Sequence, residues 1–232
     1  LNKYETKIDN YDKSISDTIR KLEMRGAKIS NDPSSIQLDG IDYVVYSSAV
    51  KSDHPLYQKA KQEHIPLIHR SELLHELFSK QYSIAVAGSH GKTTTTAMVG
   101  QVLLEAGKKP SIMLGGEVSF LNDRGGRWGS GKWGVYESDE SDGTFLNHRA
   151  DIKIVTNIDN DHLDYYQTEE GLYEAFAKFI HNRKSSFAIV YLGDKGIQCA
   201  IDLLVDRKNI IGYIEISHID SMKEKYPELH LE

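Results

Sequence analysis

Cysteine is almost absent from this chain of 232 residues, which contains only Cys199. A single cysteine excludes a disulfide within the chain and favours a reducing compartment. Because Cys199 lies among Ile197, Ala200 and Ile201, we expect it to be a buried structural thiol. Long apolar runs are also missing, since no stretch approaches the ~18 residues of a membrane span. With no signal peptide expected either, these absences favour a cytoplasmic protein that does not enter a membrane.

An excess of basic residues is missing too. The chain has 28 lysines and arginines against 34 aspartates and glutamates, which gives a formal net charge of −6. Nonspecific binding to nucleic acid is therefore not expected. The hydrophobic share of 39% and the charged share of 27% are typical of a globular chain. The length is sufficient for a buried core in one large domain or two modest ones.

The first third of the chain alternates between strand and helix patterns. Residues 41–46 and 65–69 are rich in β-branched and aromatic side chains, which is typical of buried strands. Helices are expected between and after them, and this alternation predicts a parallel sheet. Ligands of such sheets bind where the strands end, which is where Ser47 and Ser48 lie. The two serines fit a ligand pocket and an ordinary turn equally well.

The most informative stretch is YSIAVAGSHGKTTTTAM, residues 82–98. Residues 84–87 predict a short buried strand, residues 88–91 a glycine turn, and Lys92 with the threonines the start of a helix. This layout wraps phosphate groups with backbone N–H groups and a helix N-terminus, while the lysine reaches the outer phosphates and Thr93 can hold Mg²⁺. Two glycines are required because a Cβ would keep the backbone from closing on the anion. The pattern is the short form GxxGKTT rather than GxxxxGK[ST].

An acidic segment, ESDESD at residues 137–142, directly follows the predicted strand 133–136. In nucleotide-binding folds, an acid at the tip of a strand beside the phosphate loop holds Mg²⁺ directly or through water. Four acids in six residues repel one another unless a cation or water separates them. The segment therefore predicts a metal site beside Lys92 and Thr93, with a solvated acidic loop as the alternative.

A second cluster, TNIDNDH at residues 156–162, follows the predicted strand 152–155. His162 stands among aspartates and could bind a metal, act as a base or pair with a carboxylate. Because Mg²⁺ prefers oxygen ligands, the residues alone favour a structural histidine that pairs with a carboxylate. His90 lies inside the phosphate loop and is a candidate for contact with substrate.

The rest of the chain predicts further strands and helices up to about residue 214. A strand is expected over residues 110–114, ended by Gly115 and Gly116. Residues 122–132, NDRGGRWGSGK, predict a mobile surface loop without chemistry. The tail from residue 217 is polar and is expected to be weakly structured.

Five blocks in this order resemble the Mur ligases, the ATP-dependent amide-forming enzymes of peptidoglycan precursor synthesis. The blocks are VVYSSAV (residues 44–50), IPLIHRSELL (65–74), AGSHGKTTTT (87–96), ESDESDGTFL (137–146) and TNIDNDHLDYY (156–166). The resemblance spans roughly residues 41–180. It implies an α/β fold in which a partial Rossmann-like, UDP-sugar-binding domain (1–80) precedes a P-loop ATPase-type central domain with a mostly parallel sheet (81–232). No GxGxxG precedes Gly88, so we expect an internal fragment that lacks the start of the first domain and a C-terminal domain.

The resemblance also implies a role for each matching residue. Lys92 would hold the outer phosphates of ATP, and Thr93 with Glu137 would hold one Mg²⁺. His162 would serve a second Mg²⁺ site, against the preference from the residues alone. The nucleotide would contact Gly88, Ser89, His90, Gly91, Lys92, Thr93, Thr94 and Asn157. The catalytic residues would be Lys92, Glu137 and His162, and the substrate-binding residues would be Ser47, Ser48 and His90.

The blocks are most similar to the family members that join L-alanine to UDP-N-acetylmuramate through an acyl phosphate. We expect the protein to be a monomer or a homodimer. Three alternatives stay open on the residues. One is a sister ligase that adds a preformed peptide to the same sugar nucleotide, and another is a plain P-loop ATPase. The third is a nucleotide-binding module without ligase activity.

Overall fold

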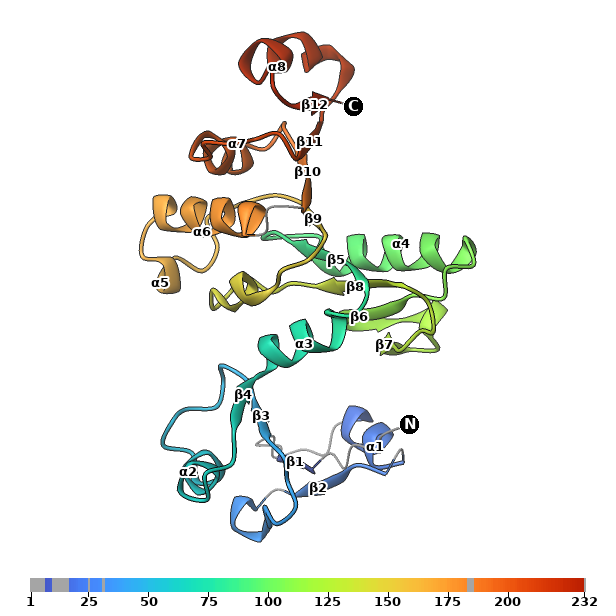
Figure 1. Ribbon diagram of the computed structural model, residues 1–232, viewed down its shortest axis with the longest axis vertical. Coiled ribbons are helices and arrows are strands. Elements are labelled where there is room, and N and C mark those ends of the chain that lie inside the picture. The colour runs from blue at the N-terminus through green and yellow to red at the C-terminus, as the bar shows by residue number, and fades with distance from the viewer. Residues whose placement is uncertain (1–6, 10–16, 25, 31, 183–185, 232) are drawn as a thin grey trace. The chain divides into compact units, whose positions relative to one another are not determined.

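The computed structural model describes residues 7–9, 17–24, 26–30, 32–182 and 186–231. The chain divides into two compact units, residues 1–70 and 71–232 (Figure 1). A domain boundary near residue 80 stays a prediction. Helix α3 (Arg70–Phe78) falls almost wholly in the second unit, although the sequence pattern groups it with the first.

The first unit pairs its strands in parallel, as the strand and helix alternation predicts. Strand β1 pairs with β2 and β3 with β4. The elements are β1 (Lys7–Asp9), α1 (Asp17–Glu23), β2 (Lys28–Ser30), β3 (Val44–Tyr46), α2 (Pro55–Gln62) and β4 (Leu67–His69). Helix α2 begins at a proline, whose fixed φ suits the first helical position, and His54 Nδ1 accepts the Leu56 N–H at 3.1 Å. Ile36, Leu38 and Ala60 form a small core.

The second unit contains an eight-stranded sheet in the order β12-β11-β10-β9-β5-β8-β6-β7. All neighbouring strands are parallel except β6 and β7. The strands are β5 (Tyr82–Ala87), β6 (Ser111–Val118), β7 (Arg124–Arg127), β8 (Trp133–Glu137), β9 (Ile152–Val155), β10 (Phe187–Tyr191), β11 (Ile210–Tyr213) and β12 (His230–Leu231). Besides α3, its α-helices are α4 (Lys92–Glu105), α5 (Leu163–Tyr166), α6 (Glu169–His181), α7 (Lys195–Asp202) and α8 (Ile219–Lys225). The α/β prediction with a mostly parallel sheet is confirmed.

Strand β5 is central because it is buried on both faces. Successive side chains of a strand point to opposite faces of the sheet, so Ile84 and Val86 pack with α4 while Ala85 and Ala87 join the core that includes α6. Figure 1 shows α4 on one side of this sheet and α6 on the other. Such double burial explains the continuous apolar run that predicts this strand. It also fixes where the chain leaves the sheet, at Gly88.

The glycine-rich segment after β6 differs from its prediction as a mobile loop. Strand β6 continues through Gly115 and Gly116, and the segment contains β7, which pairs with β6. A Cβ on Gly126 would lie 2.8 Å from Ile112 O, and Gly129 N–H donates to Ser111 Oγ at 3.0 Å. The glycines therefore allow close backbone packing, which composition alone does not distinguish from mobility.

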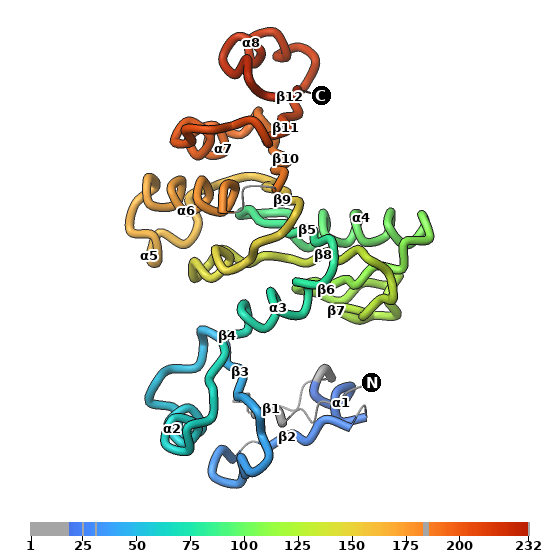
Figure 2. The backbone as a smooth tube through the Cα atoms, in the orientation of Figure 1, coloured from blue at the N-terminus to red at the C-terminus, as the bar shows by residue number. Residues whose placement is uncertain are grey.

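The C-terminal tail is also more ordered than its polarity predicts. It forms α8 and the short edge strand β12, which pairs with β11 and ends the chain's path in Figure 2. Tyr226 and Leu229 are buried in the main core of the unit. The expected burial of Cys199 is wrong, because its side chain is exposed. Ile197, Ala200 and Ile201 occupy the buried face of α7, and Cys199 lies on its other face.

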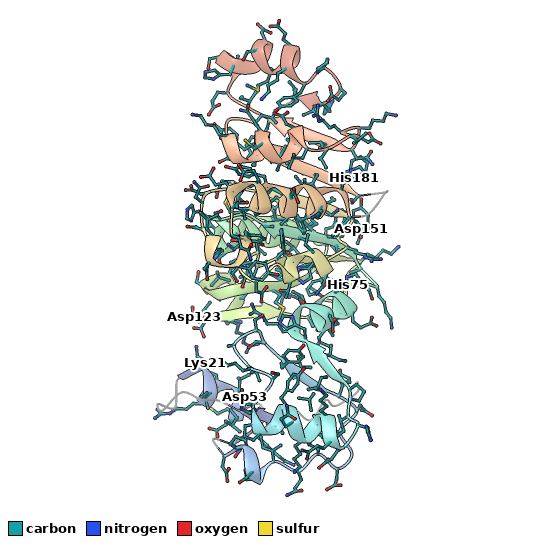
Figure 3. The ribbon with its side chains drawn as sticks, turned by 90° about the vertical axis from the view of Figure 1, so that its left-hand side faces the viewer. Lys21, Asp53, His75, Asp123, Asp151 and His181 are labelled. Atoms are coloured by element: carbon teal, nitrogen blue, oxygen red, sulfur yellow. The ribbon has the colours of Figure 1, made fainter. Side chains whose placement is uncertain are left out.

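The two edges of the sheet in the second unit carry different features. Asp151 and His181 precede β9 and β10, and Figure 3 shows them with His75 on one side of the unit, opposite Asp123. A cavity of about 420 Å³, lined in part by Phe78 and Tyr136, belongs to the side of His75. The phosphate loop lies at the opposite edge, where the parallel strands end. Among the described residues, no helix is both long and apolar enough to cross a membrane.

Candidate functional site

The predicted phosphate loop forms the turn between β5 and α4. Gly88 has a φ of +131° and Gly91 a φ of +80°, in the region that favours glycine. At Gly88 space is short as well, because a Cβ would collide with Thr156 Oγ1 and lie 2.8 Å from Asn157 O. At Gly91 nothing lies within 4 Å of a Cβ. The positive φ angles favour glycine at both positions. At Gly88 the close packing against residues 156 and 157 is a second reason for glycine.

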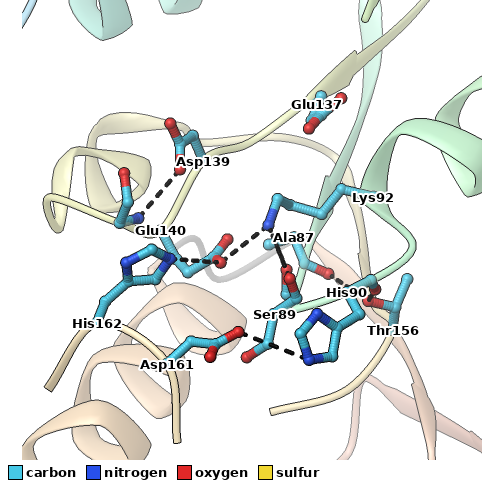
Figure 4. Close-up of polar contacts among 12 residues, drawn as sticks. Ala87, Ser89, His90, Lys92, Glu137, Asp139, Glu140, Thr156, Asp161 and His162 are labelled. Atoms are coloured by element: carbon cyan, nitrogen blue, oxygen red, sulfur yellow. Dashed lines mark hydrogen bonds and ion pairs between the residues drawn. The ribbon is translucent and has the colours of Figure 1, made fainter. Parts of the chain in front are cut away.

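Lys92 lies at the start of α4 and folds back over the loop. Its Nζ donates to Gly88 O at 2.7 Å, to Ser89 O at 3.3 Å and to Glu140 Oε1 at 2.9 Å (Figure 4). The lysine side chain is 15% exposed. The helix N-terminus and this ammonium place positive charge at the mouth of the loop, which suits a polyphosphate.

Thr93 and Glu137 bring two oxygens together beside the loop. Thr93 Oγ1 donates to Glu137 Oε2 at 2.8 Å, and Gly115 N–H donates to the same oxygen at 2.8 Å. Two ligands at neighbouring corners of an octahedral Mg²⁺, each about 2.1 Å from the ion, lie about 3 Å apart. The spacing and the oxygen chemistry of this pair therefore fit one Mg²⁺, which Thr93 and Glu137 would hold beside the loop.

His162 does not join that pair. Its Nε2 lies 3.8 Å from Glu140 Oε1, an ion pair when the ring is protonated. Among the described residues, no three His, Cys, Asp or Glu side chains gather as a metal-binding group. The contact matches the carboxylate-paired histidine that the residues alone favour, and a second Mg²⁺ site at His162 stays a prediction.

Glu140 is the residue of this site that the sequence pattern did not single out. It is fully buried at 0% exposure, and its backbone oxygen accepts the Tyr166 hydroxyl and the Gly143 N–H. Burial raises the pKa of the Glu140 carboxyl, and the neighbouring Lys92 opposes that rise. The four acids of residues 137–142 look alike in sequence and differ in how deeply their side chains are buried at the end of β8. The spacing of the acids does not predict that Glu140 is the fully buried one.

The segment after β9 holds the phosphate loop from the other side. Asn157 Oδ1 accepts the His90 N–H at 2.9 Å and Asn157 Nδ2 donates to His90 O at 3.0 Å. Thr156 Oγ1 donates to the same oxygen at 2.6 Å. Ser89 Oγ accepts the Asp159 N–H at 2.9 Å. The side chain of Asn157 therefore fixes the backbone of the loop, and its predicted contact with nucleotide stays a prediction.

The imidazole of His90 extends away from the loop toward two aspartates. Its Nε2 lies 3.6 Å from Asp161 Oδ2 (Figure 4). It also lies 3.6 Å from Asp159 Oδ2, and all three side chains are exposed. Thr94 is also exposed on the first turn of α4. These positions are open to a ligand, which is compatible with contact between His90 and substrate.

The two predicted substrate-binding serines lie in the first unit, directly after β3. Ser48 Oγ lies 3.0 Å from His69 Nε2, and Ser47 O accepts the Val50 N–H at 2.9 Å. The ring of His69 also meets Tyr46 edge-on, with 5.3 Å between the centroids. The ends of two parallel strands therefore carry a polar pair, which is compatible with both a pocket and a turn.

Two family models each match a part of the chain. The model described as "Mur ligase family, catalytic domain" matches residues 11–82, and the model described as "Mur ligase middle domain" matches residues 133–226. The chain belongs to the Mur ligase family. The resemblance that the five sequence blocks indicate is thereby confirmed.

Curated relatives place the chain within this family. It is 42% identical over 189 residues to the UDP-N-acetylmuramate–L-alanine ligase of Aquifex aeolicus, covering 81% of this chain and 41% of the relative. It is 42% identical over 207 residues to the enzyme of that name from Rhodospirillum rubrum, covering 88% of this chain and 42% of the relative. The chain therefore spans less than half the length of these Mur ligases.

Solved Mur ligase structures share the fold. UDP-N-acetylmuramate–alanine ligase from Thermotoga maritima superposes with a TM-score of 0.72 at 28% identity, over 85% of this chain and 44% of that one. UDP-N-acetylmuramate:L-alanyl-γ-D-glutamyl-meso-diaminopimelate ligase from Neisseria meningitides gives 0.74 at 21% identity, over 89% and 68%. At that lower identity the likeness shows the Mur ligase fold alone.

Proposed function

We propose that this chain is the nucleotide-binding part of an ATP-dependent ligase that joins L-alanine to the carboxylate of UDP-N-acetylmuramate. The observation that carries the proposal is the phosphate loop. Lys92 and Thr93 open α4 beside the buried ends of β5 and β8, in a Mur ligase chain 42% identical to relatives of that name. An amide-forming reaction needs ATP because a carboxylate is a poor acylating agent.

In the proposed reaction, the muramate carboxylate attacks the γ-phosphorus of ATP and the bond to the bridging oxygen breaks, giving an acyl phosphate and ADP. The amine of L-alanine then attacks the acyl carbon, loses a proton and displaces inorganic phosphate. Negative charge gathers on the transferred phosphoryl oxygens in the first step, and the Lys92 ammonium would stabilise it. Mg²⁺, held by Thr93 and Glu137, would supply further charge neutralisation. The loop backbone from Gly88 to Gly91 would orient the phosphates.

The remaining assignments belong to the same proposal. Ser47 and Ser48 would line the uridine-nucleotide pocket, and His90, which is exposed at the loop, would face the substrate. A second Mg²⁺ would lie near His162. We place the protein in the cytoplasm, where ATP and nucleotide-activated sugars are available, as a monomer or homodimer.

The test is a reaction with ATP, Mg²⁺, UDP-N-acetylmuramate and L-alanine, in which each component is omitted in turn. Phosphate release and product mass are measured for this chain and for a chimera that adds the parts of the Aquifex aeolicus relative that lie outside the matched segment. The expected result is release that requires both substrates, with a product heavier by one alanyl residue. Phosphate release that is independent of L-alanine would instead identify a plain ATPase.

The sister activity is distinguished in the same assay. Replacing L-alanine with a preformed peptide that begins with L-alanine should give no product if the proposal holds. A product with the peptide and none with L-alanine would assign the chain to the peptide-adding type. Binding of ADP without turnover by either protein would support a nucleotide-binding module.

A further inference from the structure

The three N–H groups of Lys92 are all directed at acceptors of the protein itself. An ammonium has three donors and no acceptor. Gly88 O, Ser89 O and Glu140 Oε1 lie 2.7, 3.3 and 2.9 Å from Lys92 Nζ. A phosphate oxygen can therefore bind this ammonium only if one of these three acceptors gives it up.

Glu140 is the acceptor most similar to a phosphate. Gly88 O and Ser89 O are neutral carbonyls of the loop, whereas Glu140 carries the one carboxylate that contacts Lys92 Nζ among the described residues. Hydrogen bonds between charged partners are roughly twice as strong as neutral ones. The exchange of Glu140 for phosphate is therefore the step that decides how tightly the loop holds a nucleotide.

The surroundings of Glu140 fix its carboxylate in place. The residue has no exposed surface, and its Oε2 has no hydrogen-bond partner among the described residues. Tyr166 and Gly143 both bind its backbone oxygen. Once Lys92 leaves, the basic side chain that remains beside this carboxylate among the described residues is His162, whose Nε2 lies 3.8 Å from Oε1. A buried carboxylate without a close cation is costly, so Glu140 opposes the departure of Lys92.

We propose that Glu140 is a positioning residue that occupies the place of a nucleotide phosphate on Lys92 and competes with it. The ligand class is a nucleoside di- or triphosphate. In the empty protein Glu140 holds the lysine over the loop, and binding exchanges one anionic oxygen for another. Part of the phosphate binding energy is spent on this exchange. The inference rests on the proposed function only in requiring that the loop bind nucleotide.

The test measures ADP affinity by calorimetry for the 232-residue chain in EDTA, which keeps Mg²⁺ out of the comparison. Glu140→Gln retains the shape of the side chain and removes its charge. We expect it to bind ADP about tenfold more tightly, because a charge-assisted contact on Lys92 becomes a weaker neutral one. Asp164→Asn, an exposed position two residues after His162, removes the same charge nearby. It should change the affinity less than twofold.

A double-mutant cycle identifies the cause of any gain. In a Lys92→Met background, Glu140→Gln should no longer strengthen ADP binding, because no ammonium is left to compete for. A gain of full size in that background would assign the effect to direct repulsion of phosphate and would overturn the inference. Glu140→Asp, which withdraws the carboxylate by one methylene, should give an intermediate affinity if competition holds.

The other outcomes separate the two proposals. Unchanged or weaker ADP binding by Glu140→Gln, with wild-type binding intact and thermal unfolding unaltered, overturns the competition and leaves the proposed function standing. Weaker binding would mean that Glu140 holds Lys92 in the position the phosphate needs. Absence of ADP binding by the wild-type chain and by both Glu140 variants would overturn both proposals.

Discussion

Two acid-rich segments leave the sheet at the same edge and hold the phosphate loop in different ways. The segment at the end of β8, residues 137–142, binds the side chains of Lys92 and Thr93 through carboxylates. The segment after β9, residues 156–162, binds the backbone at residues 89 and 90 through a hydroxyl, an amide and a backbone carbonyl, and its Asp159 N–H binds the Ser89 hydroxyl. The first segment sets the charge of the loop, and the second sets its shape.

The difference between the segments follows from burial. Glu140 is fully buried and must pair with a cation, whereas the side chain of Asp159 is 69% exposed and is hydrated. Exposed ion pairs are worth about 0–1 kcal/mol, but a buried carboxylate that loses its partner is strongly unfavourable. Acids that look equivalent in sequence therefore perform unequal work. Five substitutions, in four experiments, test this contrast, beginning with the largest expected effect.

Removing the ammonium of Lys92, which pairs with the buried Glu140, should have the largest effect. Lys92→Met in the chimera with the unmatched parts of the Aquifex aeolicus relative should lower the rate of alanine-dependent phosphate release by about 10²–10³. The physical reason is the loss of the ammonium that would stabilise the charge on the transferred phosphoryl group. Lys178→Met on the exposed face of α6 is the control and should leave the rate unchanged. Equal rates for all three proteins would remove Lys92 from the proposed mechanism.

Replacing Glu137, the carboxylate that pairs with Thr93, should alter how ADP affinity responds to Mg²⁺. Glu137→Gln keeps an oxygen beside Thr93 but removes the charge that a metal ion requires. We expect the gain in ADP affinity on adding Mg²⁺ to fall about tenfold, with ADP affinity in EDTA nearly unchanged. The measurement is a pair of ADP titrations with and without Mg²⁺. A full gain in the variant would mean that Mg²⁺ is held elsewhere.

Removing a contact between residues 156–162 and the phosphate loop should mainly lower the stability of the protein. Asn157→Ala removes two hydrogen bonds to the His90 backbone, each worth roughly 0.5–1.5 kcal/mol. The free energy of unfolding in urea should therefore fall by about 1–3 kcal/mol, with a smaller loss of ADP affinity than Lys92→Met causes. Asn160→Ala, which removes an exposed contact with Glu169, should cost less than about 0.5 kcal/mol. Equal losses for the two asparagines would contradict the assigned role of Asn157.

Neutralising the exposed acids should have the smallest effect. Asp159→Asn and Asp161→Asn each remove one ion pair with His90, and such exposed pairs contribute about 0–1 kcal/mol. We expect changes below twofold in ADP affinity, measured in the same titration. A tenfold change in either variant would show that the contrast between buried and exposed acids does not hold.

The sequence predicts the elements of this fold best where burial makes the pattern strong. The apolar run of β5, the glycine turn and the start of α4 were predicted because a strand buried on both faces reads as continuous hydrophobicity. Strand β7 was missed because glycines that permit close packing have the same composition as a flexible loop. The tail was missed because two buried residues, Tyr226 and Leu229, are enough to anchor an otherwise polar segment.

The candidate site was predictable in its parts and less so in their pairing. Spacing from the ends of β5, β8 and β9 brings the phosphate loop and both acidic segments to one edge. Spacing does not say which acid faces which cation, since Glu137 and Glu140 lie three residues apart and turn to different partners. The prediction that Cys199 is buried failed for a related reason, because neighbours in sequence lie on different faces of a helix.

The packing at Gly88 also limits how this protein can change over generations. A Cβ at that position would strike Thr156 Oγ1 and the backbone of Asn157, which come from a distant part of the chain. A mutation at residue 88 therefore cannot be accepted alone; it would need a compensating rearrangement of the second segment at the same time. Residue 88 and residues 156–157 are therefore expected to change together in evolution, because a substitution in one of them limits which residues the other can accept.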